Sequence, residues 1–214
     1  AGGVKLSGLR TEIKALEARV RFKKSAEFGY HSAISRRQDL QKWVEIDLGE
    51  ALEASQIVLH ACHDEFGGIG AGFGFPVRFQ VEVDSKESGM ITVYDRDSAD
   101  VVNPGLEPIV IDVGGRKIRR VRVTASKLAE RKNDYIMALG EVRVLDQNGE
   151  NRAKGKPITS LDSIEAPERW ARRNLTDGEW PHYQDPEAAK SLQVAKRELA
   201  KLNRQIETPQ LIAE

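Results

Sequence analysis

The spacing of hydrophobic residues changes twice along this chain of 214 residues, and one type of element cannot accommodate both spacings. Near each end, apolar residues recur at alternating intervals of three and four positions. Between the two ends they alternate with polar residues, as in Trp43–Gly49. The first pattern predicts helices with one apolar seam, and the second predicts strands with one buried face. We therefore expect a β core flanked in sequence by two helices.

The first helix is expected within residues 1–24. Its seam consists of Leu6, Leu9, Ile13, Leu16 and Val20. This spacing is that of the a and d positions of a heptad. An isolated helix of this length is marginally stable in water, so its seam requires a partner.

The second helix is expected over residues 185–208. Asp185-Pro186-Glu187 provides an N-cap, a proline in the first turn and an acidic residue near the positive end of the helix dipole. Its seam consists of Leu192, Ala195, Leu199, Leu202 and Ile206, and Thr208-Pro209 is expected to end it. The matching seams predict an antiparallel two-helix coiled coil. Pairing with another chain or with a domain outside this sequence is the alternative.

Residues 25–184 are predicted to form an antiparallel β-sandwich. The expected strands cover residues 43–49, 57–62, 77–84, 90–94, 108–113, 118–124 and 136–145. We expect Gly49 to close the first strand and Gly140 to form a bulge. The strands are short, clusters of turn-forming residues separate them, and no βαβ alternation occurs, so a parallel-sheet enzyme fold is not expected.

Charge and composition exclude several classes of function. Lys and Arg number 33 and so do Asp and Glu, whereas a protein that binds nucleic acid or an anionic membrane would carry a basic excess. No apolar run approaches the roughly 20 residues of a membrane span. The single cysteine, Cys62, excludes an internal disulfide. No nucleophile lies in a recognisable triad, so we expect no enzyme activity from this chain.

Several of the expected strands contain sequence motifs that are typical of one protein family. Trp43–Gly49 (WVEIDLG), Ile118–Thr124 (IRRVRVT) and Ala138–Val144 (ALGEVRV) resemble strands of discoidin-like, galactose-binding-like domains. The resemblance implies a jelly-roll binding module. The sequence segment that usually begins such a domain follows the closing strand instead. In this chain it runs from Gly155–Ser160 to Asn174–Gly178. Either a second, truncated domain begins there, or residues 155–178 supply a displaced opening strand; we favour the second, a circular permutation.

The chain also resembles the region between two domains of unknown function in large planctomycete-type proteins, some of which carry a cytochrome-c-like domain. The matching phrases are Phe28–Ser32, Cys62–Asp64, Gly70–Pro76, Leu161–Ala166 and Asn174–Gly178. This resemblance implies an accessory module of a larger exported protein, located outside the cytoplasm. Neighbouring domains of the parent chain would be among its partners.

The resemblance to discoidin-like domains also implies a structural Ca²⁺ site. Such modules often hold the ion between the Asp-Gly loop of the opening strand and the glutamate of the closing strand. In this sequence those residues are Asp177 and Glu141, together with the backbone carbonyl near Leu175. The alternative is a surface Asp-Gly turn beside a solvated carboxylate.

Ligand binding is expected on loops at one end of the sandwich, and carbohydrate is the expected ligand. A sugar site requires an aromatic face and a few planar polar groups. The candidates are Tyr30, His31, His63, Asp64, Phe66, Phe73, Arg131, Asn133, Asp134 and Tyr135. The competing hypothesis is a structural spacer or docking module that positions neighbouring domains without binding sugar.

Overall fold

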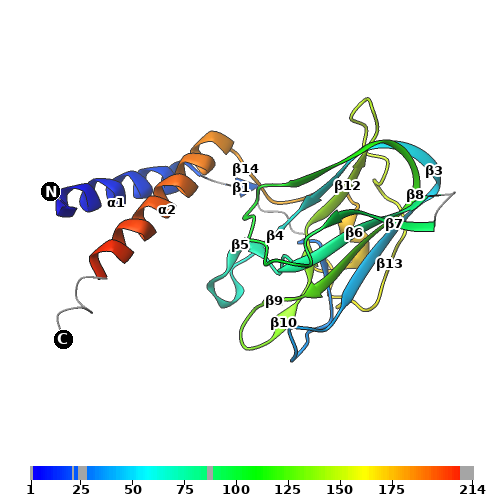
Figure 1. Ribbon diagram of the computed structural model, residues 1–214, viewed down its shortest axis with the longest axis horizontal. Helices are drawn as coiled ribbons and strands as arrows, with labels where there is room; N and C mark the ends of the chain where they lie inside the picture. Colours follow the sequence, from blue (N-terminus) through cyan, green and yellow to red (C-terminus); the bar gives the residue numbers. More distant parts are fainter. Residues whose placement is uncertain (1, 21, 24–27, 86–88, 208–214) are drawn as a thin grey trace. The chain divides into compact units, whose positions relative to one another are not determined.

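The computed structural model describes residues 2–20, 22–23, 28–85 and 89–207 (Figure 1). The chain divides into two compact units, Ala1–Lys23 with His182–Glu214, and Lys24–Pro181. The first unit contains the two helices and one short strand pair, and the second contains the other β-sheets. The architecture is therefore mainly β and antiparallel, with one helix near each end of the chain.

The helices α1 (Gly2–Arg19) and α2 (Pro186–Glu207) pack antiparallel within one chain. Ion pairs link Lys5 to Glu198 and Arg19 to Asp185, each at 3.0 Å. The buried contact is made by Leu9, Ile13, Leu16, Ala188 and Ala195. The antiparallel pairing within one chain is thus found, whereas the interlocking geometry of a coiled coil stays a prediction. Neither described helix is both long and apolar enough to cross a membrane.

The second helix begins as its sequence predicts. The Asp185 carboxylate accepts the backbone N–H of Ala188 at 2.9 Å, which is the N-cap interaction. Two short strands, β1 (Phe22–Lys23) and β14 (His182–Tyr183), pair antiparallel beside the helices. The predicted stop at Thr208-Pro209 and the side chain of Ile206 lie outside the described residues.

One antiparallel sheet forms most of the sandwich, in the order β12-β3-β8-β6-β7, with β13 also paired to β3. Its strands are β3 (Lys42–His60), β6 (Arg78–Ser85), β7 (Gly89–Asp95), β8 (Ile109–Lys127), β12 (Glu141–Leu145) and β13 (Ile158–Ser160). The smaller pairs are β2 (Tyr30–His31) with β11 (Ala138–Leu139), β4 (Cys62–Asp64) with β5 (Gly70–Phe73), and β9 (Ala129–Glu130) with β10 (Tyr135–Ile136).

Two long strands bend and so bring the halves of this sheet face to face. The register between β3 and β8 shifts between Asp47 and Leu52 and again between Ala54 and Gln56. Gly49 has a φ of 89° within β3, so it permits an irregularity where we had predicted the end of a strand. The predicted strands 108–113 and 118–124 are likewise one strand, β8, because its Gly114 and Gly115 form a bulge and not a reversal.

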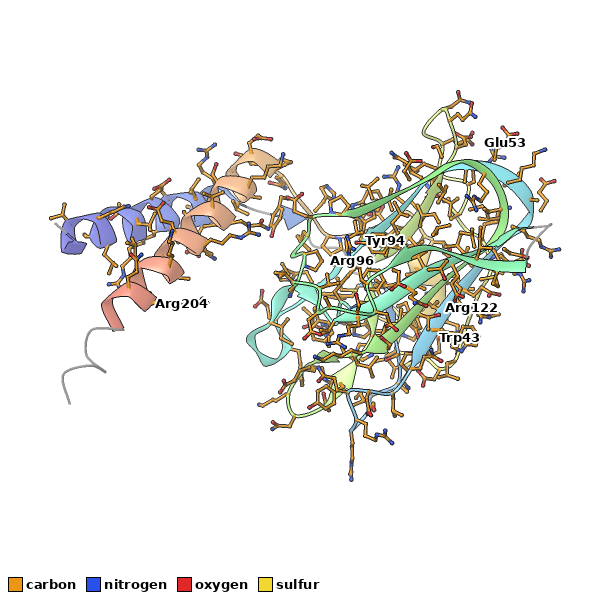
Figure 2. All side chains as sticks on the ribbon, in the orientation of Figure 1. Trp43, Glu53, Tyr94, Arg96, Arg122 and Arg204 are labelled. Carbon is orange, nitrogen blue, oxygen red and sulfur yellow. The ribbon has the colours of Figure 1, made fainter. Side chains whose placement is uncertain are left out.

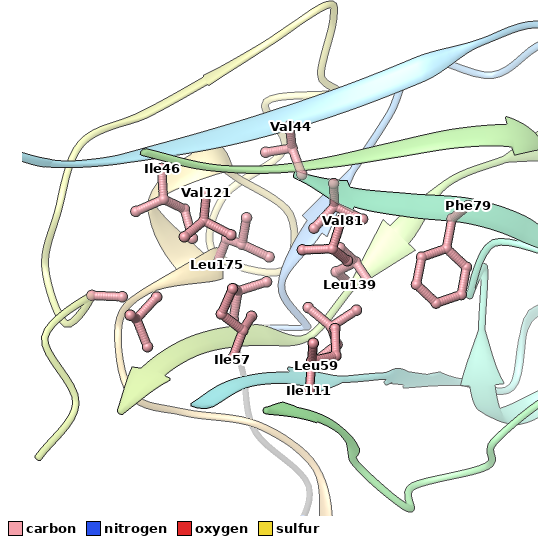
Figure 3. Packing of buried hydrophobic residues seen from close by; sticks show 14 of the residues in the cluster. Val44, Ile46, Ile57, Leu59, Phe79, Val81, Ile111, Val121, Leu139 and Leu175 are labelled. Carbon is pink, nitrogen blue, oxygen red and sulfur yellow. The ribbon is translucent and has the colours of Figure 1, made fainter. Parts of the chain in front are cut away.

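The core lies between the two halves of the bent sheet. Val44, Ile46 and Leu48 are buried, which confirms the face that their alternation predicted. Figure 3 shows Val44 and Ile46 directed toward Ile57 and Leu59 across the interior. On the outer face, Glu45 pairs with Arg122 at 2.9 Å, and the Arg122 guanidinium lies 4.5 Å from the centre of the Trp43 ring (Figure 2).

The predicted strand 136–145 is interrupted. Gly140 lies between β11 and β12, and its N–H donates to the His60 carbonyl at 2.8 Å. A Cβ at this position would lie 2.7 Å from the Ala61 carbonyl oxygen. Glycine is therefore required by the close approach of the two backbones, and not by a regular bulge.

The segment after β12 returns to the sheet. Ile158 of β13 pairs with Ile46 of β3, as predicted for a displaced strand. Trp170, which follows this strand, lies in a separate cluster with Phe28 and Phe73. Strand pairing alone does not distinguish permutation from other connections, so circular permutation stays a prediction.

Candidate functional site

Two loops that are distant in sequence meet at one end of the sandwich. The first carries the short 3₁₀ turn η1 (Phe66–Gly68) between β4 and β5, and the second is the turn between β9 and β10. The Arg131 guanidinium lies 4.6 Å from the centre of the Phe66 ring. A Cβ on Gly67 would lie 3.1 Å from the Arg131 carbonyl oxygen. The predicted meeting of these loops is confirmed.

Arg131 is held in place by Asp134. Its Nε and Nη2 donate to the two carboxylate oxygens at 2.9 and 2.7 Å, and its backbone N–H donates to the Asp134 carbonyl at 2.8 Å. The side-chain hydrogen bonds lower the pKa of Asp134, which therefore stays ionised. This bidentate pair fixes the plane of the guanidinium against Phe66.

Asp64 fixes the other loop. One carboxylate oxygen accepts the Phe66 backbone N–H at 3.0 Å, and the other accepts a hydrogen bond from Arg169 at 2.8 Å. His63 lies beside it, with Nε2 3.1 Å from a carboxylate oxygen of Glu65. The orientation of Phe66 therefore depends on the Asp64 side chain at the end of β4.

Only some of the predicted ligand residues reach the surface. Phe66 is 45% exposed, and Asn133 is exposed in a left-handed conformation with a φ of 60°. Asp64, Arg131 and Asp134 are half-buried. An aromatic ring and planar polar groups thus share one surface.

Other predicted residues lie beneath that surface. Tyr30 is fully buried and donates its hydroxyl to the Asp162 carbonyl at 2.9 Å, and Phe73 is 1% exposed. His31 and His63 are also buried, while Tyr135 is half-buried and is tied through its backbone to Ser35. Tyr30, Phe73 and His31 cannot touch a ligand on the loops, because their apolar or aromatic character places them in the interior.

His31 belongs to an aromatic cluster behind the loops. Its ring centre lies 5.0 Å from that of Trp170 and 6.0 Å from that of Phe73. Its Nδ1 lies 2.6 Å from the Ser32 carbonyl oxygen. Burial lowers the pKa of His31, so the neutral ring is favoured in the folded protein.

Arg169, which joins the site, was not among the predicted residues. It binds Asp64, and its guanidinium lies 4.3 Å from the centre of the Phe28 ring. No local spacing in the sequence indicates this role. Only the return of residues 158–178 to the sandwich could have suggested it.

The predicted metal residues lie near one another. Glu141 is fully buried, and one of its oxygens accepts the Gly178 N–H at 3.2 Å while the other, Oε2, has no hydrogen-bond partner among the described residues. Burial raises the pKa of Glu141 to about 9, and the charge of Asp177 adds to the increase. Asp177 accepts the Glu179 N–H at 2.8 Å, and the Leu175 side chain is buried.

This donor set fits a calcium ion only in part. A buried carboxylate oxygen without a partner, near a second carboxylate, would suit a hard cation. The described residues hold no group of three or more His, Cys, Asp or Glu side chains that could bind a metal. Backbone carbonyls and water would have to supply the remaining oxygens. Lys154 also comes close, since its Nζ lies 3.3 Å from where a Cβ on Gly178 would be.

No protein-family model matches this chain, and no curated protein does. Several solved structures resemble part of it. CpGH89CBM32-4 of Clostridium perfringens is 23% identical, with a TM-score of 0.34 over 47% of this chain and 66% of its own. The lectin domain of lectinolysin, solved with Lewis B antigen, is 14% identical, with a TM-score of 0.40 over 60% and 92%. CBM32-1 from a family 31 glycoside hydrolase of Clostridium perfringens is 14% identical, with a TM-score of 0.36 over 58% and 92%. No residue role is transferred from them.

Proposed function

We propose that the sandwich is a non-catalytic module that binds carbohydrate on the surface formed by Phe66, Arg131 and Asp134. The observation that carries this proposal is the fixed guanidinium over a half-exposed aromatic ring. Carbohydrate is also the ligand class of the lectin domain solved with Lewis B antigen.

The geometry suits a sugar because a pyranose ring has one apolar face and several hydroxyl groups at its rim. The exposed part of Phe66 would cover the apolar face. The remaining N–H groups of Arg131 would donate to hydroxyl oxygens, and the Asp134 carboxylate would accept from hydroxyl groups. Since Asp134 already orders Arg131, binding costs little side-chain entropy.

Such a site is expected to bind weakly. Each sugar hydroxyl must leave water, so the net gain is about 1 kcal/mol per hydrogen bond. We expect dissociation constants near 1 mM, or about −4 kcal/mol. In this role the module would be an accessory part of a larger exported protein outside the cytoplasm, as the resemblance to the planctomycete-type proteins implies.

Calcium is part of the proposal as a structural ion. Glu141 and Asp177 would hold it with the Leu175 carbonyl. The ion would keep the Glu141 carboxylate ionised inside the protein and so fasten the 174–178 segment to β12. It would take no part in sugar recognition, because Phe66 and Arg131 lie on other loops.

A titration followed by NMR tests the proposed function. Galactose and N-acetylglucosamine, each raised to about 50 mM, should shift the backbone amides of residues 63–70 and 131–135 with half-saturation near 1 mM. Mannitol serves as a control for non-specific polyol effects. If the amides of both loops stay unshifted, the sugar site is excluded and the docking-module hypothesis is favoured.

A further inference from the structure

A cavity of about 260 Å³ lies where β3 bends, away from the loops described above. It is lined by Leu52, Glu53, Asp146, Gln147, Asn148 and Arg152. The first two residues belong to β3, and the others belong to the turn that follows β12. Figure 2 labels Glu53 at the bend of the strand.

The strand register places this cavity at the opposite end of the β3–β12 pair from the Phe66 loops. His60 pairs with Glu141, and Gln56 pairs with Leu145, so β12 runs toward the bend. The turn after Leu145 therefore emerges beside Leu52, whereas β4 continues from His60 in the other direction. Along β3, the seven steps from Glu53 to His60 span about 23 Å.

The turn that lines the cavity is rigid. The Asp146 carboxylate accepts the N–H groups of Asn148 and Glu150 at 2.9 and 3.0 Å. The Ser55 hydroxyl lies within 3.1 Å of the Leu145 carbonyl and 2.8 Å of the Asp146 carbonyl, which ties the turn to β3. The backbone of the turn is therefore held in position before a ligand arrives.

Three lining side chains have polar groups that the protein does not use. Among the described residues, the side chains of Glu53, Gln147 and Asn148 make no hydrogen bond or ion pair. They can therefore offer a carboxylate acceptor and two amide groups to a ligand. Leu52 adds an apolar, half-buried surface on the same wall.

The charges indicate what kind of ligand fits. The Arg152 guanidinium lies 3.2 Å from Glu150 and 3.9 Å from Asp146, so its charge is already compensated. Glu53 adds a further negative charge, which disfavours phosphate, sulfate and carboxylate ligands. Hydroxyl groups match the three side chains, because they donate to the Glu53 carboxylate and the amide oxygens and accept from the amide N–H groups. An apolar wall beside them suits the carbon face of a sugar ring.

We propose that this cavity is a second carbohydrate subsite, which takes one monosaccharide unit. Its volume lies below the roughly 300–1,000 Å³ of sites for drug-sized ligands, so a single ring is the expected occupant. The subsite does not depend on the Phe66 surface, although the two would share a ligand class. With sites at both ends, one module would hold two units of a branched or repeating glycan and gain avidity.

The test uses the whole chain with galactose and N-acetylglucosamine up to about 50 mM. The subsite predicts shifts of the amides of residues 52–53 and 147–148 in the unaltered protein. Glu53→Gln and Asn148→Ala should each weaken that response about tenfold, without altering shifts at residues 63–70. Glu50→Gln is the matched control, because Glu50 is an exposed carboxylate of the same strand outside the cavity.

The outcomes separate the two proposals. Shifts confined to the Phe66 loops would overturn the subsite and leave the proposed function in place. Shifts confined to the cavity would support the subsite and contradict the Phe66 site. If Glu53→Gln and Glu50→Gln weaken the sugar-induced shifts at the cavity equally, the subsite is overturned. Those shifts would then depend on surface charge and not on the cavity. A lack of shifts at both ends would contradict both.

Discussion

The guanidinium of Arg131 lies over the ring of Phe66, with 4.6 Å between its carbon and the ring centre. The two residues come from loops on different strand pairs, and Asp134 sets the angle at which they meet. A cation over an aromatic face is worth about 0.5–1 kcal/mol at an exposed site, so the contact also orders the loops. The surface proposed to bind sugar is thus built before any ligand is present.

Replacing Arg131 with lysine tests whether that order matters. Lysine keeps the charge but loses the planar group and the bidentate pair with Asp134. We expect about tenfold weaker sugar binding, with a melting temperature lowered by about 2–4 °C through the lost pair and stacking. Arg96→Lys is the control, because Arg96 lies 4.9 Å from the Tyr94 ring at another place on the sandwich (Figure 2). Equal loss in both variants, measured by NMR titration, would contradict a specific role for Arg131.

The ion pair between Lys42 and Asp162 joins β3 to the segment after β13. The Lys42 side chain is only 9% exposed, and Asp162 also accepts the Ala33 N–H at 2.8 Å. Asp162→Ala should therefore lower the free energy of unfolding by about 3–5 kcal/mol, because it leaves a buried ammonium unpaired. Asp39→Ala removes a pair that is exposed on both sides and should cost far less, because water screens it. Urea denaturation measures both, and similar losses would show that burial does not matter here.

The sequence predicts those elements in which local pattern and burial agree. Val44, Ile46 and Leu48 alternate and are buried, and the heptad seams of the two ends meet. Local pattern fails where a glycine changes the path of a strand. Gly49 was expected to end a strand, yet with positive φ it lets β3 bend and continue to His60.

The candidate site was only partly predictable. Phe66 and Arg131 were placed on meeting loops because loops cluster at the ends of a sandwich. The sequence does not indicate whether Tyr30 is buried, because tyrosine occurs both in protein cores and in sugar-binding sites. The contribution of Arg169 depends on a tertiary contact with Asp64, and the spacing of residues along the sequence does not indicate such a contact. The cavity at the bend depends in turn on where β3 departs from a regular strand.

His31 should make stability depend on pH. Burial lowers its pKa in the folded state from an ordinary value of 6.5. Between these two values the unfolded chain binds a proton that the folded protein does not, so the free energy of unfolding falls as pH decreases below about 6.5. The slope from one proton is at most about 1.4 kcal/mol per pH unit. The free-energy difference between the unaltered protein and His31→Gln should therefore shrink between pH 7 and pH 5, as urea denaturation at each pH would measure. A difference that stays constant over this range would contradict the role of His31.

The helix pair gives a prediction about local stability. Leu16 is buried between α1 and α2, and burying a large apolar side chain contributes about 1.5–3 kcal/mol. Leu16→Asp should therefore increase hydrogen exchange in both helices, because each depends on the other. Val194→Asp changes an exposed position of α2 and is the control. If Leu16→Asp accelerates exchange in α1 alone, the pairing does not support α2.

Calcium removal tests the proposed ion at Glu141 and Asp177. Extracellular modules bind Ca²⁺ with dissociation constants of about 0.1–1 mM, so 10 mM Ca²⁺ should stabilise the fold by about 1.4–2.7 kcal/mol. For a domain of this size the melting temperature would rise by about 3–10 °C over the value in EDTA.

Glu141→Gln should abolish that rise while keeping the hydrogen bond from Gly178, and Glu50→Gln should retain it. Mg²⁺ should have little effect, because it demands a smaller octahedral shell. Equal melting temperatures in Ca²⁺ and EDTA would contradict the calcium site. Glu141, which the structure buries and does not leave solvated, would then be a protonated core residue beside an Asp-Gly turn.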